Sequence, residues 1–267
     1  SNSVFLRRNV ITRRVEYRAP SSFTQDFQPY WQPIEDWVVN SLWTKLSRIK
    51  PTRVQDMYRV IESDFVPNFN PFEEYFARLP PWDGSNHILV LSMSVQVKGG
   101  SKMQDLFYQY LRKWLVGVVT GWLDPTEVNH EILVLIGEQG CYKTTWFQYL
   151  LPPELRRYFY TKTNANRMSR DDLLTLAQYG VICCEELESM RPAEMNQLKA
   201  AVTMQSIDER AAYAHYHEHR KHIASFCGTG NNVQFLNDPT GNRRWMTFEV
   251  ESIDNPHKNP IDYEGVF

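Results

Sequence analysis

The segment LVLIGEQGCYKTTW, residues 133–146, has the residue types of a phosphate-binding loop. An apolar run leads into two glycines, a lysine and a threonine, and an apolar stretch of helical character follows. In such loops backbone N–H groups surround the β-phosphate, the lysine neutralises β/γ-phosphate charge, and the threonine hydroxyl binds Mg²⁺. We therefore expect ATP and Mg²⁺ here, with the nucleotide held by Gly137, Glu138, Gln139, Gly140, Cys141, Tyr142, Lys143, Thr144 and Thr145.

Tyr142 departs from this pattern, because the position before the lysine is usually a glycine. Its Cβ could crowd the loop, or its ring could point outward and lie over the nucleotide. The alternative interpretation of the segment is an ordinary strand, turn and helix with an incidental lysine.

Two adjacent glutamates end a second apolar run, YGVICC, residues 179–184. An ATP-hydrolysing site needs one carboxylate on a neighbouring strand to hold the Mg²⁺ shell, and often a second one to deprotonate the attacking water. We predict that Glu185, together with Thr144, serves the metal and that Glu186 is the general base. A solvated acidic turn is the alternative.

A third apolar run, HIASFCGTGNN, ends in polar residues, and Asn231 is our candidate for positioning the water beside the γ-phosphate. Turn formation would explain the same residues. Arg243 and Arg244 precede the last strand-like run, where an arginine could stabilise transition-state charge in cis or from a neighbouring subunit. Either arginine could instead form a surface ion pair.

The elements that must position these residues change character along the chain. Residues 4–20 resemble a hairpin, and residues 30–123 show mainly helical periodicity. Beyond residue 129, short apolar strands alternate with helix-like stretches, which predicts an α/β fold with a parallel sheet. The expected ranges are 1–128 for a hairpin and helical module, 129–250 for a phosphate-loop NTPase domain, and 251–267 for a tail or truncated element.

Composition limits the possible partners of the chain. The 267 residues carry a formal net charge of −2 and a calculated pI near 6.4, so nucleic-acid binding must come from a local basic patch. Four cysteines without metal-type spacing predict buried free thiols and a reducing cytoplasm. The apolar stretch 113–123 is too short to cross a membrane. The start SNS suggests a piece of a longer protein.

Taken in order, these motifs resemble the virulence-associated protein E family. The resemblance rests on LPPWDG, LVLIGEQGCYKTTW, ICCEELESM, FCGTGN and FLNDPTGNRRW, within residues 70–250. It implies a phosphate-loop ATPase of the AAA+/helicase-like type, similar to superfamily-3 helicases of phages and mobile elements, often behind a primase domain. It also implies a hexameric or other ring acting on single-stranded DNA, with Arg210, Arg220, Arg243 or Arg244 reaching a neighbour's nucleotide.

The stretch ERAAYAHYHEHRKHIASF, residues 209–226, lies where related ring ATPases carry a hairpin facing the central channel. There, phosphates and bases of single-stranded DNA would meet Tyr216, His219, Arg220 and Lys221. A solvated hairpin is an equal alternative. A metal site on His215, His217 and His219 is a weaker one, because no complementary ligand has suitable spacing.

The function expected from the sequence is that of a Mg²⁺-dependent ATPase that moves or remodels single-stranded DNA during replication. The alternative is a nucleotide-dependent assembly or adaptor module with little hydrolysis, which the altered loop at Tyr142 would suit.

Overall fold

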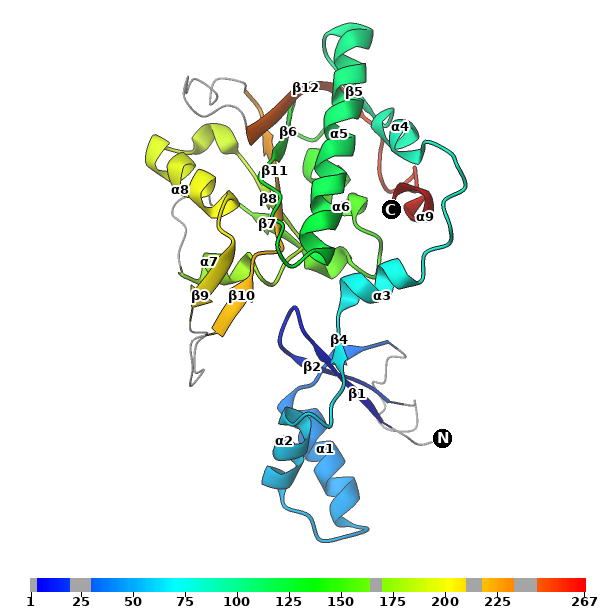
Figure 1. Ribbon diagram of the computed structural model, residues 1–267, viewed down its shortest axis with the longest axis vertical. Helices are drawn as coiled ribbons and strands as arrows, with labels where there is room; N and C mark the ends of the chain where they lie inside the picture. Colours follow the sequence, from blue (N-terminus) through cyan, green and yellow to red (C-terminus); the bar gives the residue numbers. More distant parts are fainter. Residues whose placement is uncertain (1–3, 20–29, 164–169, 210–217, 233–243) are drawn as a thin grey trace. The chain divides into compact units, whose positions relative to one another are not determined.

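The computed structural model describes residues 4–19, 30–163, 170–209, 218–232 and 244–267 (Figure 1). The chain divides into two compact units, Ser1–Glu74 and Tyr75–Phe267. Each unit has its own sheet, so the units are considered one at a time.

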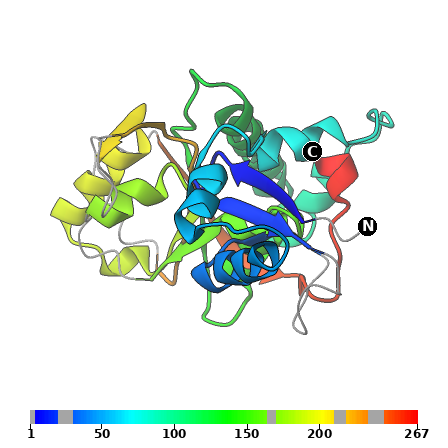
Figure 2. The same cartoon turned by 90° about the horizontal axis from the view of Figure 1, so that it is seen from below.

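The first unit combines a small sheet with two helices that lie side by side (Figure 2). Its helices are α1 (Asp36–Ser47) and α2 (Val54–Glu62). Its strands, in spatial order, are β3 (Gln32–Pro33), β2 (Val15–Arg18), β1 (Phe5–Asn9) and β4 (Asn68–Phe69). Strands β1 and β2 pair antiparallel, as the hairpin expected for residues 4–20 requires. The module is thus less purely helical than its periodicity indicates.

The second unit is built on a six-stranded sheet. Its strands, in spatial order, are β5 (Val95–Val97), β12 (Trp245–Ile253), β6 (Ile132–Ile136), β11 (Ser225–Gly230), β8 (Val181–Cys184) and β7 (Phe159–Lys162). The five strands from β12 to β7 run parallel, and β5 pairs antiparallel with β12. The mixed α/β fold with a parallel sheet that the sequence predicts is therefore present.

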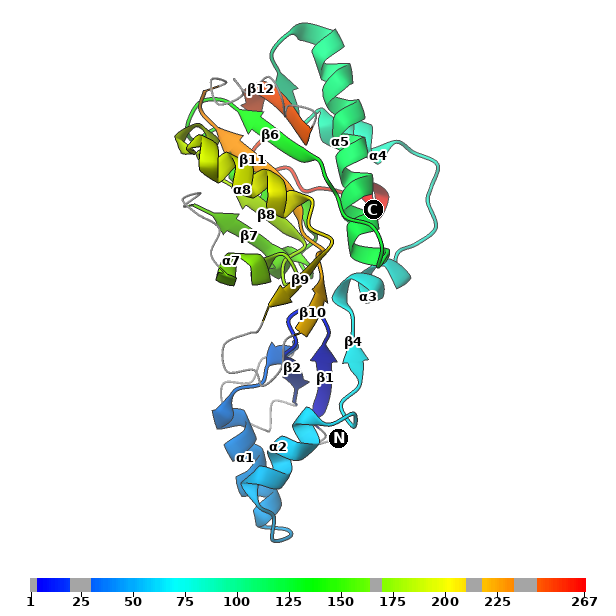
Figure 3. The ribbon, with the colours of Figure 1, turned by 60° about the vertical axis from the view of Figure 1, so that its left-hand side comes forward.

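Helices cover both faces of this sheet (Figure 3). The helices along this part of the chain are α3 (Pro71–Ala77), which spans the unit boundary, α4 (His87–Ser92), α5 (Gly100–Leu123), α6 (Lys143–Leu150), α7 (Arg170–Thr175), α8 (Pro192–Val202) and α9 (Tyr263–Val266). Two 3-10 turns, η1 (Arg156–Tyr158) and η2 (Leu187–Ser189), complete the layers.

The buried strand β6 shows why two helical layers are needed. Successive side chains of a strand point to opposite faces, and all five residues of β6 are buried. Ile132, Val134 and Ile136 belong to the core cluster that includes Leu198 and Val202 of α8. The opposite face is covered by α5 and α6, which contact each other through rings such as those of Trp114 and Phe147, 6.1 Å apart.

Helix α5 belongs to the second unit, although the expected boundary at residue 128 placed it in the first. The indole N–H of Trp114 donates to the carbonyl oxygen of Phe226 in β11 at 2.8 Å, and that of Trp122 donates to Gly180 at 3.1 Å. Helical periodicity shows that a helix has an apolar face but does not reveal which partner buries it. The compact units therefore divide at Glu74.

The residues after β12 pack against the rest of the second unit. The Tyr263 hydroxyl donates to the Tyr149 carbonyl oxygen of α6 at 2.7 Å. The ring of Phe267 stacks on Trp122, with centroids 6.1 Å apart. Aromatic side chains thus fix the end of the chain in place.

The cysteines behave as their setting in the sequence predicts. All four are free, and Cys183, Cys184 and Cys227 are buried in β8 and β11. Burial raises the pKa of the Cys184 thiol to about 12, so this side chain stays protonated and inert. In the part of the chain that the structure describes, no helix has the length and apolarity needed to span a bilayer.

Candidate functional site

The carboxyl ends of β6, β11 and β8 meet at one edge of the sheet. Gly230 pairs with Ile136, and Gly228 pairs with Cys184, so the loops that follow these strands emerge together. They enclose a pocket of about 350 Å³. It is lined by Gln139, Gly140, Cys141, Tyr142, Lys143, Thr144, Thr145, Glu185, Glu186, Thr229, Gly230 and Asn231. We call this feature the phosphate-loop pocket, after the phosphate-binding loop that the sequence predicts at residues 137–143.

The strand order corrects one expectation. The acidic strand β8 is not the neighbour of β6, because β11 lies between them. Asn231 therefore follows the central strand, between the loop after β6 and the two glutamates after β8. The sequence gives the order of strands along the chain, whereas their order in the sheet is decided by tertiary packing.

The loop between β6 and α6 closes tightly on the sheet. Gly137 N–H donates to the Gly230 carbonyl oxygen at 3.1 Å. A Cβ at Gly137 would lie 3.2 Å from the Val250 carbonyl oxygen of β12, so glycine permits this close approach. Gly140 has φ +86°, a left-handed conformation that glycine adopts without strain.

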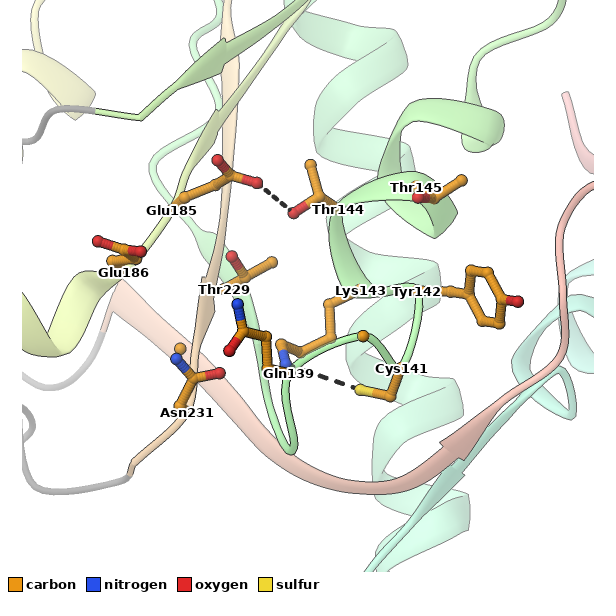
Figure 4. Close-up of a pocket in the computed structure, with 12 residues that line it drawn as sticks. Gln139, Cys141, Tyr142, Lys143, Thr144, Thr145, Glu185, Glu186, Thr229 and Asn231 are labelled. Atoms are coloured by element: carbon orange, nitrogen blue, oxygen red, sulfur yellow. Dashed lines mark hydrogen bonds between the residues drawn. The ribbon is translucent and has the colours of Figure 1, made fainter.

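Lys143 is the first residue of α6, and its ammonium group is held inside the loop (Figure 4). Its Nζ donates to the carbonyl oxygens of Gly137 and Glu138, each at 2.7 Å, and lies 3.6 Å from the Cys141 Sγ. Only 8% of the residue is exposed. A positive charge is therefore fixed at a helix N-terminus, where unpaired backbone N–H groups also favour an anion.

Thr144 and Glu185 face each other across the pocket (Figure 4). The Thr144 hydroxyl donates to Glu185 Oε1 at 2.6 Å, which joins α6 to the end of β8. A hydroxyl and a carboxylate so close fit Mg²⁺, which binds one or two protein oxygens and takes its other ligands from phosphates and water. Among the described residues, no group of three or more His, Cys, Asp or Glu side chains forms a separate metal site.

Tyr142 does not fill the loop. Its backbone adopts the left-handed conformation, φ +65°, that glycine would take at this position. Its ring points away from Glu185, Glu186 and Asn231, toward the segment after β12 (Figure 4). The hydroxyl accepts a hydrogen bond from the Asn255 Nδ2 at 3.3 Å. The pocket thus remains open although residue 142 is a tyrosine and not a glycine. The crowding of the loop by the Tyr142 Cβ, which the sequence allowed for, is not observed.

Glu188 is a member of the site that the sequence analysis missed. Its Oε1 accepts hydrogen bonds from the backbone N–H of Asn231 at 3.0 Å and from the Asn231 Nδ2 at 2.9 Å. Glu186, by contrast, is exposed and lies in a left-handed turn with φ +52°. The repeat of acidic residues in EELE was the available signal, but nothing in it distinguishes a carboxylate that faces solvent from one that fixes Asn231.

Arg244 does not lie at this edge of the sheet. Arg244 immediately precedes β12, whose first residue Trp245 pairs with Ile132 at the start of β6. The loop at residues 137–143 follows the carboxyl end of β6, whereas Arg244 lies beside its amino end. Arg244 is therefore on the side of the sheet opposite the phosphate-loop pocket. The predicted contact in cis is therefore wrong for Arg244, and only the contact from a neighbouring subunit stays a prediction. Arg243 and Arg210 lie outside the described residues.

Two paired strands are described at the ends of residues 206–221, which include most of the histidine-rich stretch. Strands β9 (Ser206–Glu209) and β10 (Glu218–Lys221) pair antiparallel. His219 is exposed, and its Nδ1 lies 2.6 Å from Asp208 Oδ1. Tyr216, His215 and His217 lie outside the described residues.

Two of the residues predicted to contact DNA are directed into the protein instead. Arg220 is 7% exposed. Lys221 Nζ donates to the carbonyl oxygens of Gly121 and Asp124 at the end of α5. Burial lowers the pKa of Lys221. Both side chains are engaged in packing, so the prediction that they contact DNA is corrected; a charge pattern alone does not show which basic side chains are buried.

Solved structures with a similar fold include the C-terminal region of NrS-1 in apo form. Three structures of this region match with TM-scores of 0.52, 0.54 and 0.53, each at 13% identity. The matches cover 94%, 94% and 99% of this chain and 59%, 59% and 66% of the NrS-1 chains. The chain therefore spans less than two thirds of those structures, and at this identity the likeness concerns the fold.

Comparison with curated proteins gave no match. The sequence model of the virulence-associated protein E-like domain matches residues 78–265, a range that covers the parallel sheet, helices α4 to α8 and the phosphate-loop pocket. The chain belongs to the virulence-associated protein E-like domain family.

Proposed function

We propose that this chain is a Mg²⁺-dependent ATPase with a phosphate-loop NTPase core, and that the phosphate-loop pocket is its active site. The observation that carries the proposal is the contact of 2.6 Å between Thr144 Oγ1 and Glu185 Oε1, beside the buried Lys143. A lysine at a helix N-terminus, a hydroxyl and a carboxylate are the groups that bind a triphosphate and its metal. If Lys143 had no role in binding, there would be no reason for the polar residues after β6, β8 and β11 to gather around it.

Binding would exchange hydrogen bonds within the loop for bonds to phosphate. Lys143 Nζ would move from the carbonyl oxygens of Gly137 and Glu138 to β- and γ-phosphate oxygens. Thr144 and Glu185 would hold Mg²⁺, directly or through its water shell. When bound, Mg²⁺ neutralises phosphate charge.

Hydrolysis needs a base and an orienting group on the side of the pocket away from Tyr142. Glu186 is exposed at the end of β8 and would accept the proton of a water whose oxygen attacks the γ-phosphorus. The bond from that phosphorus to the β,γ-bridging oxygen then breaks, and ADP leaves. Asn231, fixed by Glu188, would orient the water.

Membership of the family supports a role in replication, with single-stranded DNA as the substrate on which the ATPase acts. Assembly into a ring, a hexamer for example, and a primase domain elsewhere in the protein are parts of this proposal. Of the four residues predicted to contact DNA, His219 of β10 is the one that is both described and exposed, with 71% of its side chain accessible, and in such a ring it would be available to DNA.

Two variants test the ATPase proposal. Lys143→Ala removes the charge that holds the phosphates, so ATP binding should be lost. Glu186→Gln keeps the shape of the side chain but cannot accept the proton, so ATP should bind while turnover falls by about 10²-fold or more. Binding is measured by calorimetry, and turnover by phosphate release with and without single-stranded DNA.

Matched controls come from exposed positions of the first unit, Lys50→Ala and Glu62→Gln. Both should retain wild-type binding and turnover. Wild-type rates in both active-site variants would refute the assignment. Binding of ATP without turnover in the unmodified chain, with or without DNA, would instead favour the assembly or adaptor module.

A further inference from the structure

The phosphate-loop pocket has two chemically different sides (Figure 4). Thr144, Glu185, Glu186 and Asn231 gather on one side, where the metal and the γ-phosphate are expected. Tyr142 and Thr145 point to the other side. A phosphate chain bound over Lys143 with its γ end at Glu185 must therefore direct its α-phosphate and nucleoside toward Tyr142 and Thr145.

An aromatic ring is already presented on that second side. Tyr142 is 39% exposed although it lies in the loop. A non-glycine residue at φ +65° is strained relative to glycine, and such outliers cluster at functional sites. The ring thus stands at a position where a glycine would be easier to accommodate.

The segment that faces Tyr142 is fixed to α6. Asn255 Nδ2 donates to the Tyr142 hydroxyl at 3.3 Å. About two helical turns further on, the Tyr149 hydroxyl lies 2.8 Å from His257 Nδ1, and the two rings meet edge to face at 5.0 Å. The Arg156 guanidinium lies 4.1 Å above the Tyr149 ring centroid. Residues 254–257 are therefore held as a wall opposite the Tyr142 side of the helix.

Open space is present beside the segment that follows β12. A cavity of about 370 Å³ lies between α4, α6 and residues 254–262. Its lining includes Asp254 and Pro256, which flank Asn255, and Trp146, which follows Thr145. The volume is within the range that small ligands occupy in proteins.

We propose that Tyr142 and residues 254–257 form the nucleoside subsite of this ATPase, with the purine base stacked on the Tyr142 ring and its edge facing the Asn255 amide. This inference rests on the proposed function, because the phosphates orient the nucleoside. Aromatic stacking accepts any base, whereas an amide with both donor and acceptor groups can distinguish adenine from guanine.

Calorimetry with two probes separates this subsite from the phosphate site. The probes are ADP and inorganic tripolyphosphate, each with Mg²⁺ and the 267-residue chain. Tyr142→Ala should weaken ADP binding about tenfold, as loss of one stacking contact predicts, and leave tripolyphosphate binding unchanged. Tyr142→Phe keeps the ring and should retain ADP affinity. Asn255→Ala should reduce the preference for ADP over GDP.

Trp82→Ala, which removes an exposed ring from a different surface, is the control and should change neither affinity. If Tyr142→Ala weakened the binding of ADP and of tripolyphosphate equally, the side chain would only shape the loop. If it weakened the binding of neither, the base would lie elsewhere. Either result overturns the subsite. If the unmodified chain binds neither probe, the proposed function fails and the subsite with it. If it binds both, the phosphate site stands whatever the variants show.

Discussion

At the residue scale, Asn231 in the phosphate-loop pocket is held by a single carboxylate oxygen. Glu188 Oε1 accepts hydrogen bonds from both the backbone N–H and the side-chain amide of Asn231. The second oxygen, Oε2, is buried and has no hydrogen-bond partner among the described residues. An ionised acceptor makes stronger hydrogen bonds than a neutral one. We therefore propose Glu188 as a positioning residue, which would act on the attacking water through Asn231.

We predict that Glu188→Ala lowers kcat roughly tenfold with little change in KM, since a misplaced orienting group affects the transition state more than ATP binding. Asn231→Ala should have a similar effect. The double variant should be no worse than either single one, because both remove the same contact. Steady-state ATPase assays measure these quantities.

Glu188→Gln keeps an acceptor oxygen at the same place and should recover most of the activity. A purely structural role would appear as a lower melting temperature with unchanged turnover at 25 °C. Additive losses in the double variant would show that Glu188 acts separately from Asn231.

At the scale of elements, β11 determines how the site is assembled. It lies between the strand that leads to the loop and the strand that leads to the glutamates. Gly228 of β11 permits close packing of Leu187, because a Cβ there would lie 2.5 Å from Leu187 Cδ1 and 3.4 Å from the Cys184 carbonyl oxygen. Leu187 is fully buried and stands between Glu186 and Glu188. The position of both carboxylates thus depends on a side chain that β11 leaves room for.

Gly228→Ala should lower the free energy of unfolding by about 1–3 kcal/mol, the usual cost of overpacking a core. It should also reduce ATP turnover, because Leu187 can yield only by moving the turn that carries the glutamates. Urea unfolding and an ATPase assay at a temperature where the variant is folded check the two effects.

Gly121→Ala is the matched control in α5. A Cβ there meets its nearest atoms at 3.8 and 3.9 Å, which is ordinary contact. The change should be neutral or stabilising, since alanine favours a helix over glycine by about 1 kcal/mol. Equal destabilisation by both substitutions would contradict the packing argument.

At the scale of the whole molecule, the predicted site residues lie at two opposite ends of the parallel strands. The phosphate-loop pocket lies at the carboxyl ends of the parallel strands, and Arg244 precedes β12 at the amino ends. An arginine so placed cannot serve the pocket of its own chain. It can serve the pocket of another chain if subunits associate head to tail, as in a ring.

Mixing two inactive variants tests this arrangement. Lys143→Ala and Arg244→Ala should each abolish turnover alone. In a mixture of the two, an Arg244→Ala subunit, whose loop is intact, can lie next to a Lys143→Ala subunit, whose Arg244 is intact. Such a pair contains one complete site, so ATP turnover should be partly restored. Phosphate release from the mixture, with the mass in solution measured in parallel, gives the result. Failure of Arg244→Ala to lower turnover, or an inactive mixture of assembled subunits, would exclude Arg244 as the residue supplied in trans.

Much of the fold could be predicted because it is encoded locally. Strand alternation and helical periodicity depend on neighbours in the chain, so β6, β8, β11 and α5 were all foreseen from patterns of apolar residues. The spacing from Gly137 to Thr144, and the acids after an apolar strand, likewise identified the groups that the pocket brings together.

The sequence by itself determined which residue types end each strand, and hence the chemistry available at one edge of the sheet. The tertiary structure decided which of them meet: it placed β11 between β6 and β8, turned Tyr142 outward and Lys221 inward, and paired Glu188 with Asn231. It also assigned α5 to the sheet and Arg244 to the far edge. The physical reason is that strand order, burial of a charge and the direction of a side chain depend on partners distant in the chain, and no local pattern records them.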